Sequence, residues 1–394
     1  MGKAVPEGLR ASYPGKPTDF PSRITSFRNS LGQNPLVQQQ TEFVFDALFS
    51  LITECGRGEA ILSVDCEKER QLIRSFFECA SPRLGSYLLP LYYATRIMSR
   101  KNYGEVPILQ PSLDIGSGDG VTPAFVFDGK RLTVGSDLFI HDLVEAQQYN
   151  APFDRLMAFD VCAMPFVDNT FGTIFCMNTL YHCDDPVAAI RELVRILKPG
   201  GSLHVDVARS SFVSEWPLFN MLRGIGFDQA AREFELLVSK PENLRLAEQC
   251  PALIEQAGCS HIEVVPFMSL PLTRLILFFN SLEIFFWFGS STNFIDKILS
   301  FMNTIVAPLL AQDRKLSLDG SSYYLIKATK AGSPVHSRDD EEITQRLACP
   351  ACRAPLIYSQ ETVECRSCPR HYPCVSGIPL LTTDYLKPFE LLKD

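Results

Sequence analysis

The sequence predicts an α/β fold, with an open, parallel sheet that helices cover on both faces and a small cysteine-rich module at the end of the chain. Two observations support this prediction. From about residue 110 onward, apolar segments of strand length alternate with loops and helical segments, which is typical of a parallel sheet. Hydrophobic residues make up 46% of the 394 residues, so the chain can bury a real core and has room for two or three domains.

The part of the chain before the sheet divides into an arm and a helical region. Residues 1–34 are rich in Pro, Gly and Ser, which predicts a flexible arm. Residues 35–105 show helical periodicity and are expected to form an N-terminal helical cover, whose third helix runs over roughly 87–100. The apolar faces of its first two helices consist of Val44, Ala47, Leu48, Leu51 and Ile52, and of Leu72, Ile73, Phe76 and Phe77.

The sheet domain is expected over residues 106–330. Its seven predicted strands are Ser112–Ile115, Arg131–Val134, Arg155–Ala158, Thr173–Met177, Ser202–Val207, His261–Val265 and Tyr323–Ala328. The clearest helix between them is Pro186–Leu197. Asp185 is suited to cap its N-terminus, Pro186 fits the first helical position, and the sequence Lys-Pro-Gly-Gly that follows ends it.

An apolar insert, residues 268–312, separates the last two predicted strands. Phenylalanine, leucine and isoleucine dominate residues 270–310, but Arg274, Glu283, Asp296 and Lys297 interrupt them, so a helix that spans a bilayer is not expected. Three interpretations stay open: contact with a membrane surface or a lipophilic substrate, a packed lid over the acceptor site, and ordinary core.

Charge and the N-terminus bear on partners and location. The chain has 37 basic and 45 acidic residues and a net charge of −8, whereas proteins that grip a nucleic-acid backbone usually carry a basic excess. Nucleic acid is therefore the less favoured partner. The first 21 residues lack the apolar stretch of an export signal, so a cytoplasmic location is expected, with peripheral membrane contact through residues 270–310 left open.

A glycine-rich loop, LDIGSGDG at 113–120, follows the first predicted strand. Its G-x-G-x-G spacing lacks the third glycine of the dinucleotide-binding fingerprint. Asp114 and Asp119 flank the loop, and Asp137 ends the second strand. These carboxylates would repel a pyrophosphate but suit a cofactor that carries cationic groups and ribose hydroxyls.

Four segments in order resemble the class I S-adenosylmethionine-dependent methyltransferases, above all the broad group that includes quinone-biosynthesis and many small-molecule enzymes. They are LDIGSGDG at 113–120, VGSDL at 134–138, FDVCAMPFVDNTFGTIFCMNTLYHCDDP at 159–186 and RELVRILKPGGSLHVDV at 191–207. The resemblance implies a Rossmann-like, seven-stranded methyltransferase sheet and S-adenosylmethionine as the cofactor.

The resemblance also implies roles for individual residues. Asp114 and the backbone of Gly116, Gly118 and Gly120 would hold the methionine end, Asp137 the ribose hydroxyls, Leu138 and Val161 the adenine ring, Asp160 its amino group, and Asn178 would lie near the sulfonium. A base is needed only if the acceptor must lose a proton, and the sequence does not identify one. His182 is a candidate, and structural packing is the alternative role for this residue.

Two C-x-x-C pairs near the end of the chain predict a metal site. Cys349 and Cys352 form the first pair, Cys365 and Cys368 the second, with twelve residues between the pairs. Two such turns can complete a tetrahedral Cys₄ zinc site, and a closed shell of four thiolates is typical of structural zinc. We expect a linker over 331–342, a zinc ribbon over 343–394, and Cys374 as a small core residue.

The predicted zinc ribbon resembles the small zinc-binding activator subunits of methyltransferases that modify tRNA, ribosomal RNA and translation factors. The resemblance rests on LACPACRAPL and CRSCPRHYPCVSGIPLL. It implies that the module docks in cis on the methyltransferase domain, where covalent linkage supplies a high effective concentration. Whether the module stabilises the domain or presents substrate stays open.

Three functions follow from these patterns. The leading one is S-adenosylmethionine-dependent methyl transfer to a small or lipid-linked lipophilic acceptor, with reaction at a membrane surface left open. The apolar insert and the acidic net charge favour this function. The alternative is methylation of tRNA, rRNA or a translation protein through the zinc ribbon. The third is a scaffold that binds the cofactor without catalysis, which the intact loop carboxylates disfavour.

Overall fold

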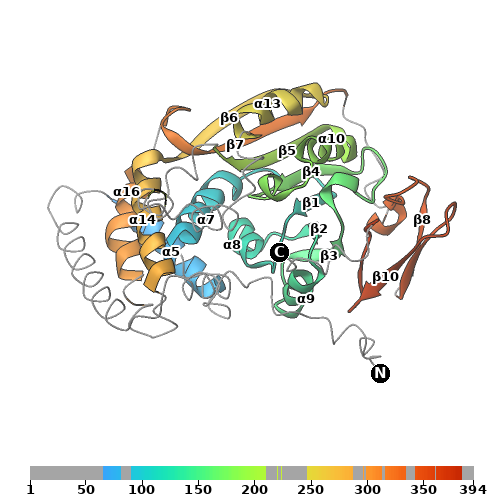
Figure 1. Ribbon diagram of the computed structural model, residues 1–394, viewed down its shortest axis with the longest axis horizontal. Helices are drawn as coiled ribbons and strands as arrows, with labels where there is room; N and C mark the ends of the chain where they lie inside the picture. The colour runs from blue at the N-terminus through green and yellow to red at the C-terminus, as the bar shows by residue number, and fades with distance from the viewer. Residues whose placement is uncertain are drawn as a thin grey trace.

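The computed structural model describes residues 65–80, 90–209, 220, 223, 246–286, 296, 299–312, 316–333, 342–359 and 361–383. The expected arm, the first predicted helix and most of the linker lie outside these residues. The described part folds into a sheet with helices on both faces and a small β module beside one sheet edge (Figure 1).

The main sheet has seven strands in the order β3-β2-β1-β4-β5-β7-β6. The strands are β1 Ser112–Ile115, β2 Leu132–Asp137, β3 Phe153–Ala158, β4 Phe171–Cys176, β5 Leu197–Ala208, β6 Cys259–Ser269 and β7 Ser321–Lys330. All seven predicted strands are present, most of them longer than expected. The prediction of a parallel sheet was wrong at one edge, because β7 runs antiparallel to both β5 and β6.

Helices cover both faces of this sheet. The α-helices are α5 Glu67–Ala80, α7 Pro90–Tyr103, α8 Val121–Phe127, α9 Ile140–Gln148, α10 Pro186–Ile196, α13 Leu246–Gln256, α14 Leu270–Phe286 and α16 Ala307–Gln312, with shorter turns at η2 Val161–Ala163, η3 Leu180–His182, η6 Met302–Val306 and η7 Ile343–Arg346. Asp185 caps α10 as predicted, since its side chain accepts a hydrogen bond from the Ala188 amide at 2.9 Å. One core lies between the sheet and α5, α7, α8, α14 and α16, and a second between the sheet and α10 and α13.

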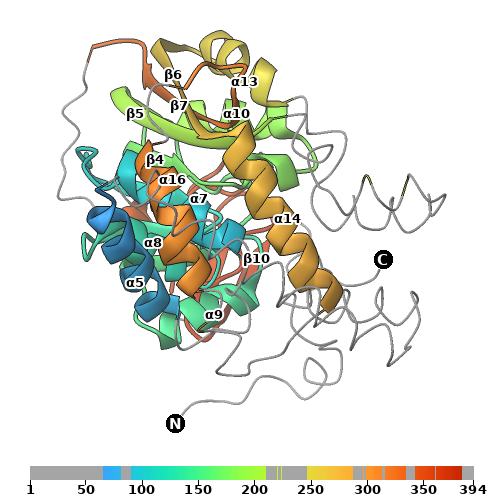
Figure 2. The same cartoon turned by 90° about the vertical axis from the view of Figure 1, so that its left-hand side faces the viewer.

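The described part of the apolar insert packs against the N-terminal helices. Figure 2 shows α14 and α16 beside α5 and α7 on one side of the sheet. Ile276, Leu277, Met302 and Val306 have no exposed surface, so these positions act as core. Within the described residues, no helix combines the length and the apolar character that crossing a bilayer requires.

The C-terminal module is a four-stranded sheet in the order β11-β10-β9-β8. Its strands are β8 Leu356–Tyr358, β9 Thr362–Cys365, β10 His371–Val375 and β11 Ile378–Pro379. The chain leaving β11 lies along the edge strand β3: Leu380 pairs in parallel with Ala158, and the Leu381 amide donates to the Ala158 carbonyl at 2.7 Å. This contact covers a strand edge that would otherwise expose unpaired backbone groups.

Candidate functional site

The glycine loop turns sharply between β1 and α8. Gly116, Gly118 and Gly120 all have positive φ angles, of 72°, 53° and 82°. The Ser117 amide donates to the Ser136 carbonyl at 2.8 Å, which fixes the loop against β2. A Cβ atom added to Gly118 would meet no atom of the described residues within 4 Å, so among these residues this part of the backbone borders open space in which a ligand can lie.

Asp137, at the end of β2, accepts two backbone hydrogen bonds. Its Oδ2 accepts from the Gly118 amide at 2.9 Å, and its Oδ1 accepts from the Phe139 amide at 3.1 Å. Burial raises the pKa of this carboxyl, although these hydrogen bonds oppose the shift. The structure therefore joins the acid expected at the ribose to the loop expected at the methionine end, and Leu138 follows it, half-buried.

Asp160, Val161 and the loop after them lie beyond the end of β3. Asp160 is the N-cap of η2, where its Oδ1 accepts from the Cys162 amide at 2.9 Å. Val161 is buried and belongs to the core on the α10 side of the sheet. The residues expected at the adenine ring thus come from a loop directly beyond the strand beside β2.

Asp206 on β5, a residue that the sequence analysis missed, contacts Asn178 and shares one face of the sheet with Asp114. The Asn178 amide donates to Oδ1 of Asp206. Asp114 and Asp206 are both buried, at 1% and 0% exposure. Burial raises the pKa of Asp114 to about 8 and that of Asp206 to about 6. An acid within the apolar strand SLHVDVA was the available sequence signal, because such a charge is costly in a core.

His182 and His204 lie near these strands in different surroundings. His182, in η3 after β4, is exposed. His204, on β5, is buried and stacks on Phe175 with ring centroids 5.2 Å apart. Burial lowers the pKa of His204 to about 4, so its ring is neutral at pH 7. The role of His182 as a general base stays a prediction.

The raised pKa of Asp206 predicts a pH-dependent stability. The pKa of this carboxyl is about 6 in the folded state and 3.8 in the unfolded state. Its contribution to the free energy of unfolding is therefore fully present below pH 4 and is lost as pH rises through 6. Asp206→Asn stays neutral, so its stability relative to the wild type should increase by about 2 kcal/mol between pH 4.5 and 7.5. Thermal unfolding at both pH values, without ligand, measures this change. The exposed Asp154→Asn is the control, and an equal shift in both variants would contradict the assignment.

The C-terminal module holds the loop that begins at Asp160. Arg353, next to a predicted metal ligand, donates from Nη1 to the Met164 carbonyl at 2.9 Å. Its Nη2 pairs with Oε1 of Glu192 at 2.9 Å, and Oε2 of Glu192 accepts from the Met164 amide at 2.9 Å. Arg195 donates to Glu192 and to the same carbonyl. Both backbone polar groups of Met164 are thus fixed by a network that joins the module to the domain.

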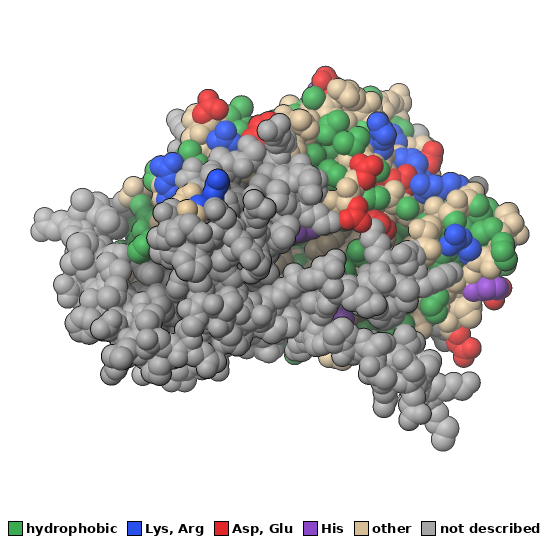
Figure 3. All heavy atoms as spheres, viewed as in Figure 1, with side chains coloured by type: hydrophobic (Ala, Val, Ile, Leu, Met, Phe, Trp, Pro, Cys, Tyr) green, Lys and Arg blue, Asp and Glu red, His purple; other side chains and the backbone are tan. Residues whose placement is uncertain are grey.

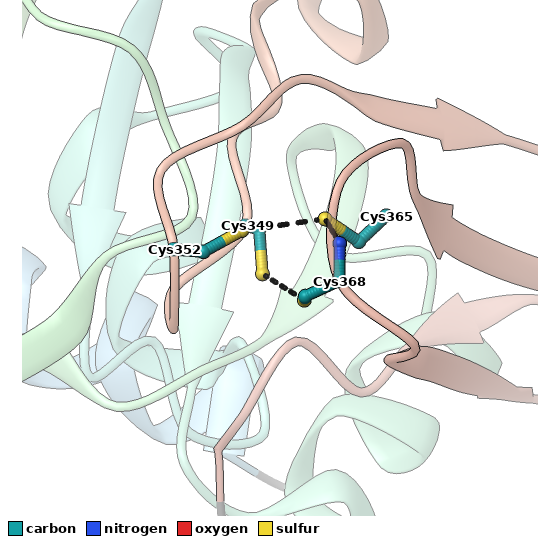
Figure 4. A group of neighbouring side chains, drawn as sticks. All are labelled: Cys349, Cys352, Cys365 and Cys368. Carbon is teal, nitrogen blue, oxygen red and sulfur yellow. Dashed lines mark hydrogen bonds between the residues drawn. The ribbon is translucent and has the colours of Figure 1, made fainter.

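Four sulfur atoms converge in the C-terminal module (Figure 4). Those of Cys349, Cys352, Cys365 and Cys368 all lie within 4.8 Å of one another. The Cys349–Cys368 and Cys352–Cys365 sulfurs are 3.7 and 3.4 Å apart. Four thiolates around zinc at about 2.3 Å would be separated by about 3.8 Å, so the cluster fits a tetrahedral ion. The fifth cysteine of the module, Cys374, lies outside the cluster.

In a comparison with known protein families, residues 113–205 match the methyltransferase domain family. The demethylmenaquinone methyltransferase of Corynebacterium kroppenstedtii is 36% identical over 24% of this chain and 39% of its own length. The tRNA U34 carboxymethyltransferase of Campylobacter curvus is 28% identical over 27% of this chain and 37% of its own length. The aligned segments thus span less than half of each relative.

Among solved structures, the phosphoethanolamine N-methyltransferase 2 of Haemonchus contortus is 20% identical, with a TM-score of 0.40. The match covers 66% of this chain and 57% of that one. The sheet order described above and the family match agree on a Rossmann-like methyltransferase domain at the centre of this chain.

Proposed function

We propose that this chain transfers a methyl group from S-adenosylmethionine to an acceptor at the carboxyl edge of the sheet. One observation carries the proposal: within a domain that matches methyltransferases, the open backbone at Gly118 is bordered by the carboxylate of Asp137. Bare backbone beside a carboxylate suits a cofactor that has ribose hydroxyls and cationic groups.

The cofactor supplies a methyl group that its sulfonium already activates. The protein must therefore bind and orient, and such positioning can account for about 7–11 kcal/mol of a reaction barrier. We assign Asp137 to the ribose hydroxyls and Asp160 to the adenine amino group. The Gly118 backbone is assigned to the methionine end. The Cys₄ cluster is assigned to a structural zinc ion, since all four positions of a tetrahedron are taken by protein ligands.

For the acceptor, we propose a small or lipid-linked lipophilic molecule. Support comes from the demethylmenaquinone relative. The described apolar side chains of α14 are largely buried, so contact with a membrane surface is proposed from the apolar sequence of residues 270–310 alone. On the face shown in Figure 3, described acidic and basic side chains intermix between the sheet and the C-terminal module, a pattern that does not favour a polyanion.

A second candidate acceptor is tRNA, rRNA or a protein of translation. The specific observation in its favour is the C-terminal module, which contacts the loop assigned to adenine through Arg353. The tRNA-modifying relative also supports it. In this alternative the module would present the substrate as well as stabilise the domain.

Asp137→Ala tests the proposal. Loss of this carboxylate removes the ribose partner and a hydrogen bond to the glycine loop, so affinity for S-adenosylhomocysteine in a calorimetric titration should fall at least tenfold. The control is Asp154→Ala, an exposed acid on β3 paired with Arg131 at 2.9 Å. Unchanged affinity of Asp137→Ala would refute the placement.

Transfer of a labelled methyl group to fractions of a cell extract then separates the two acceptor classes. Label in the lipid and small-molecule fraction supports the first, and label in RNA or protein supports the second. A wild-type protein that neither binds the cofactor nor transfers label would overturn the proposed function.

A further inference from the structure

Two buried carboxylates face the helix α7 from the same side of the sheet. The register aligns Asp114 of β1 with Phe175 of β4 and His204 of β5, so these three side chains stand on one face. Asp206 lies two residues beyond His204 and shares that face, one step nearer the carboxyl edge. The Tyr103 ring of α7 packs edge-on against Phe175 and His204, which shows that this helix covers the face.

These carboxylates are incompletely hydrogen-bonded within the described residues. Both oxygens of Asp114 and Oδ2 of Asp206 have no hydrogen bond of ordinary geometry from these residues, although the Ser117 hydroxyl lies near Asp114 and the Tyr103 hydroxyl lies near Asp206. Oδ1 of Asp206 accepts from the Asn178 amide. Burying a carboxylate costs roughly several kcal/mol of free energy unless a cation pairs with it or donors hydrogen-bond to it. A positively charged ligand with hydrogen-bond donors would supply the partners that the two carboxylates lack.

Arg96, on α7, brings a cation to the same place. Arg96 lies seven residues, about two helical turns, before Tyr103, so it shares the face of α7 that covers the two acids. Its charge lowers the pKa of both Asp114 and Asp206. The Arg96 Nε donates to the Thr122 hydroxyl at 3.0 Å, which ties it to the helix that starts just after the glycine loop. Two acids and one guanidinium therefore meet beside the loop, and this is the complement of a zwitterion with one ammonium and one carboxylate.

We propose that Asp206 and Arg96 complete the subsite for the amino-acid end of the cofactor. Asp206, together with Asp114, accepts hydrogen bonds from the α-ammonium, and Arg96 donates to the α-carboxylate. This inference rests on the proposed function and adds to it two residues from β5 and α7. It also accounts for two incompletely hydrogen-bonded acids in an aromatic layer, since the ligand would supply the missing donors and a positive charge.

Truncated ligands test each half of the subsite separately. S-adenosylhomocysteine carries both charged groups, its decarboxylated form carries the ammonium alone, and methylthioadenosine carries neither. In calorimetric titrations, Arg96→Gln should lower the affinity for S-adenosylhomocysteine by about tenfold to a hundredfold. Its affinity for the decarboxylated form should stay within twofold of the wild-type value. Asp206→Asn should lower the affinity for S-adenosylhomocysteine and for its decarboxylated form, and should leave the affinity for methylthioadenosine within twofold of the wild-type value. The exposed Arg131→Gln is the control and should change none of the three.

Each other outcome counts against the inference. If Asp206→Asn or Arg96→Gln weakens methylthioadenosine as much as the longer ligands, the residue supports the fold and not the subsite. If neither variant changes any affinity, the subsite is elsewhere. Should Asp206→Asn fail to fold in a thermal unfolding check, Arg96→Gln alone decides. A wild-type protein that binds none of the ligands would instead overturn the proposed function.

Discussion

Replacing Cys349 by serine is expected to abolish stoichiometric zinc binding and to unfold the C-terminal module. Its sulfur is buried and lies 3.7 Å from that of Cys368 and 3.0 Å from the Tyr372 hydroxyl. Zinc binding contributes about 10–16 kcal/mol of apparent free energy in small Cys/His domains, so a four-stranded module with few core residues depends on it. Elemental analysis of the purified protein and the loss of an unfolding transition measure the effect.

The matched control is Cys374→Ser, which changes a cysteine of the same module that lies outside the cluster. This variant should retain the metal and lose little stability. A Cys349→Ser protein that keeps stoichiometric zinc, or a wild type that contains none, would refute the metal assignment.

The same Cys349→Ser variant should bind the cofactor more weakly. Arg353 lies four residues after Cys349, and its amide donates to the Cys349 carbonyl at 2.8 Å. The Arg353 side chain holds the Met164 carbonyl, four residues after Asp160. If the turn around the metal unfolds, the loop assigned to adenine loses one of its two arginine contacts, and affinity for S-adenosylhomocysteine should fall. An unchanged affinity would show that Arg195 and Glu192 hold the loop unaided.

Local sequence patterns predicted the elements whose cause is local. The glycine loop, the strand before it and the Asp185 cap of α10 each depend on a few adjacent residues. The Cys₄ cluster is similar, because each C-x-x-C turn brings two sulfurs together by its own geometry. The direction of β7 has no such local signal, since an apolar alternation reads the same in parallel and antiparallel strands.

The residues that the sequence analysis missed depend on contacts between distant segments. Asp206 is buried because α7, about a hundred residues earlier in the chain, covers its side of the sheet. Arg96 reaches the helix after the glycine loop only because the fold packs α7 beside that helix, where Arg96 donates to the Thr122 hydroxyl. The pairing of Leu380 with Ala158 likewise joins residues far apart in sequence, so no spacing or periodicity could reveal it.

Gly116→Ala is expected to lower both the stability of the domain and its cofactor affinity. With φ at 72°, an alanine would be strained, and its Cβ would lie 2.1 Å from the Thr179 Oγ1. The Thr179 side chain cannot turn away without cost, because its hydroxyl lies 3.1 and 2.9 Å from the carbonyls of Ile115 and Met177. Strain and overpacking together should cost about 3 kcal/mol. Thermal unfolding should show a Tm lowered by roughly 5–10 °C.

Gly118→Ala in the same loop separates stability from binding. Its φ of 53° adds about 1 kcal/mol of strain, but a Cβ there meets no atom within 4 Å in the part of the chain that the structure describes. This variant should therefore unfold within a few degrees of the wild type and still lose affinity for S-adenosylhomocysteine at least tenfold, because the methyl group occupies space assigned to the cofactor. Normal binding by Gly118→Ala would mean that the cofactor does not lie against this backbone. Equal losses of stability in both variants would mean that backbone strain, and not contact with Thr179, decides the effect.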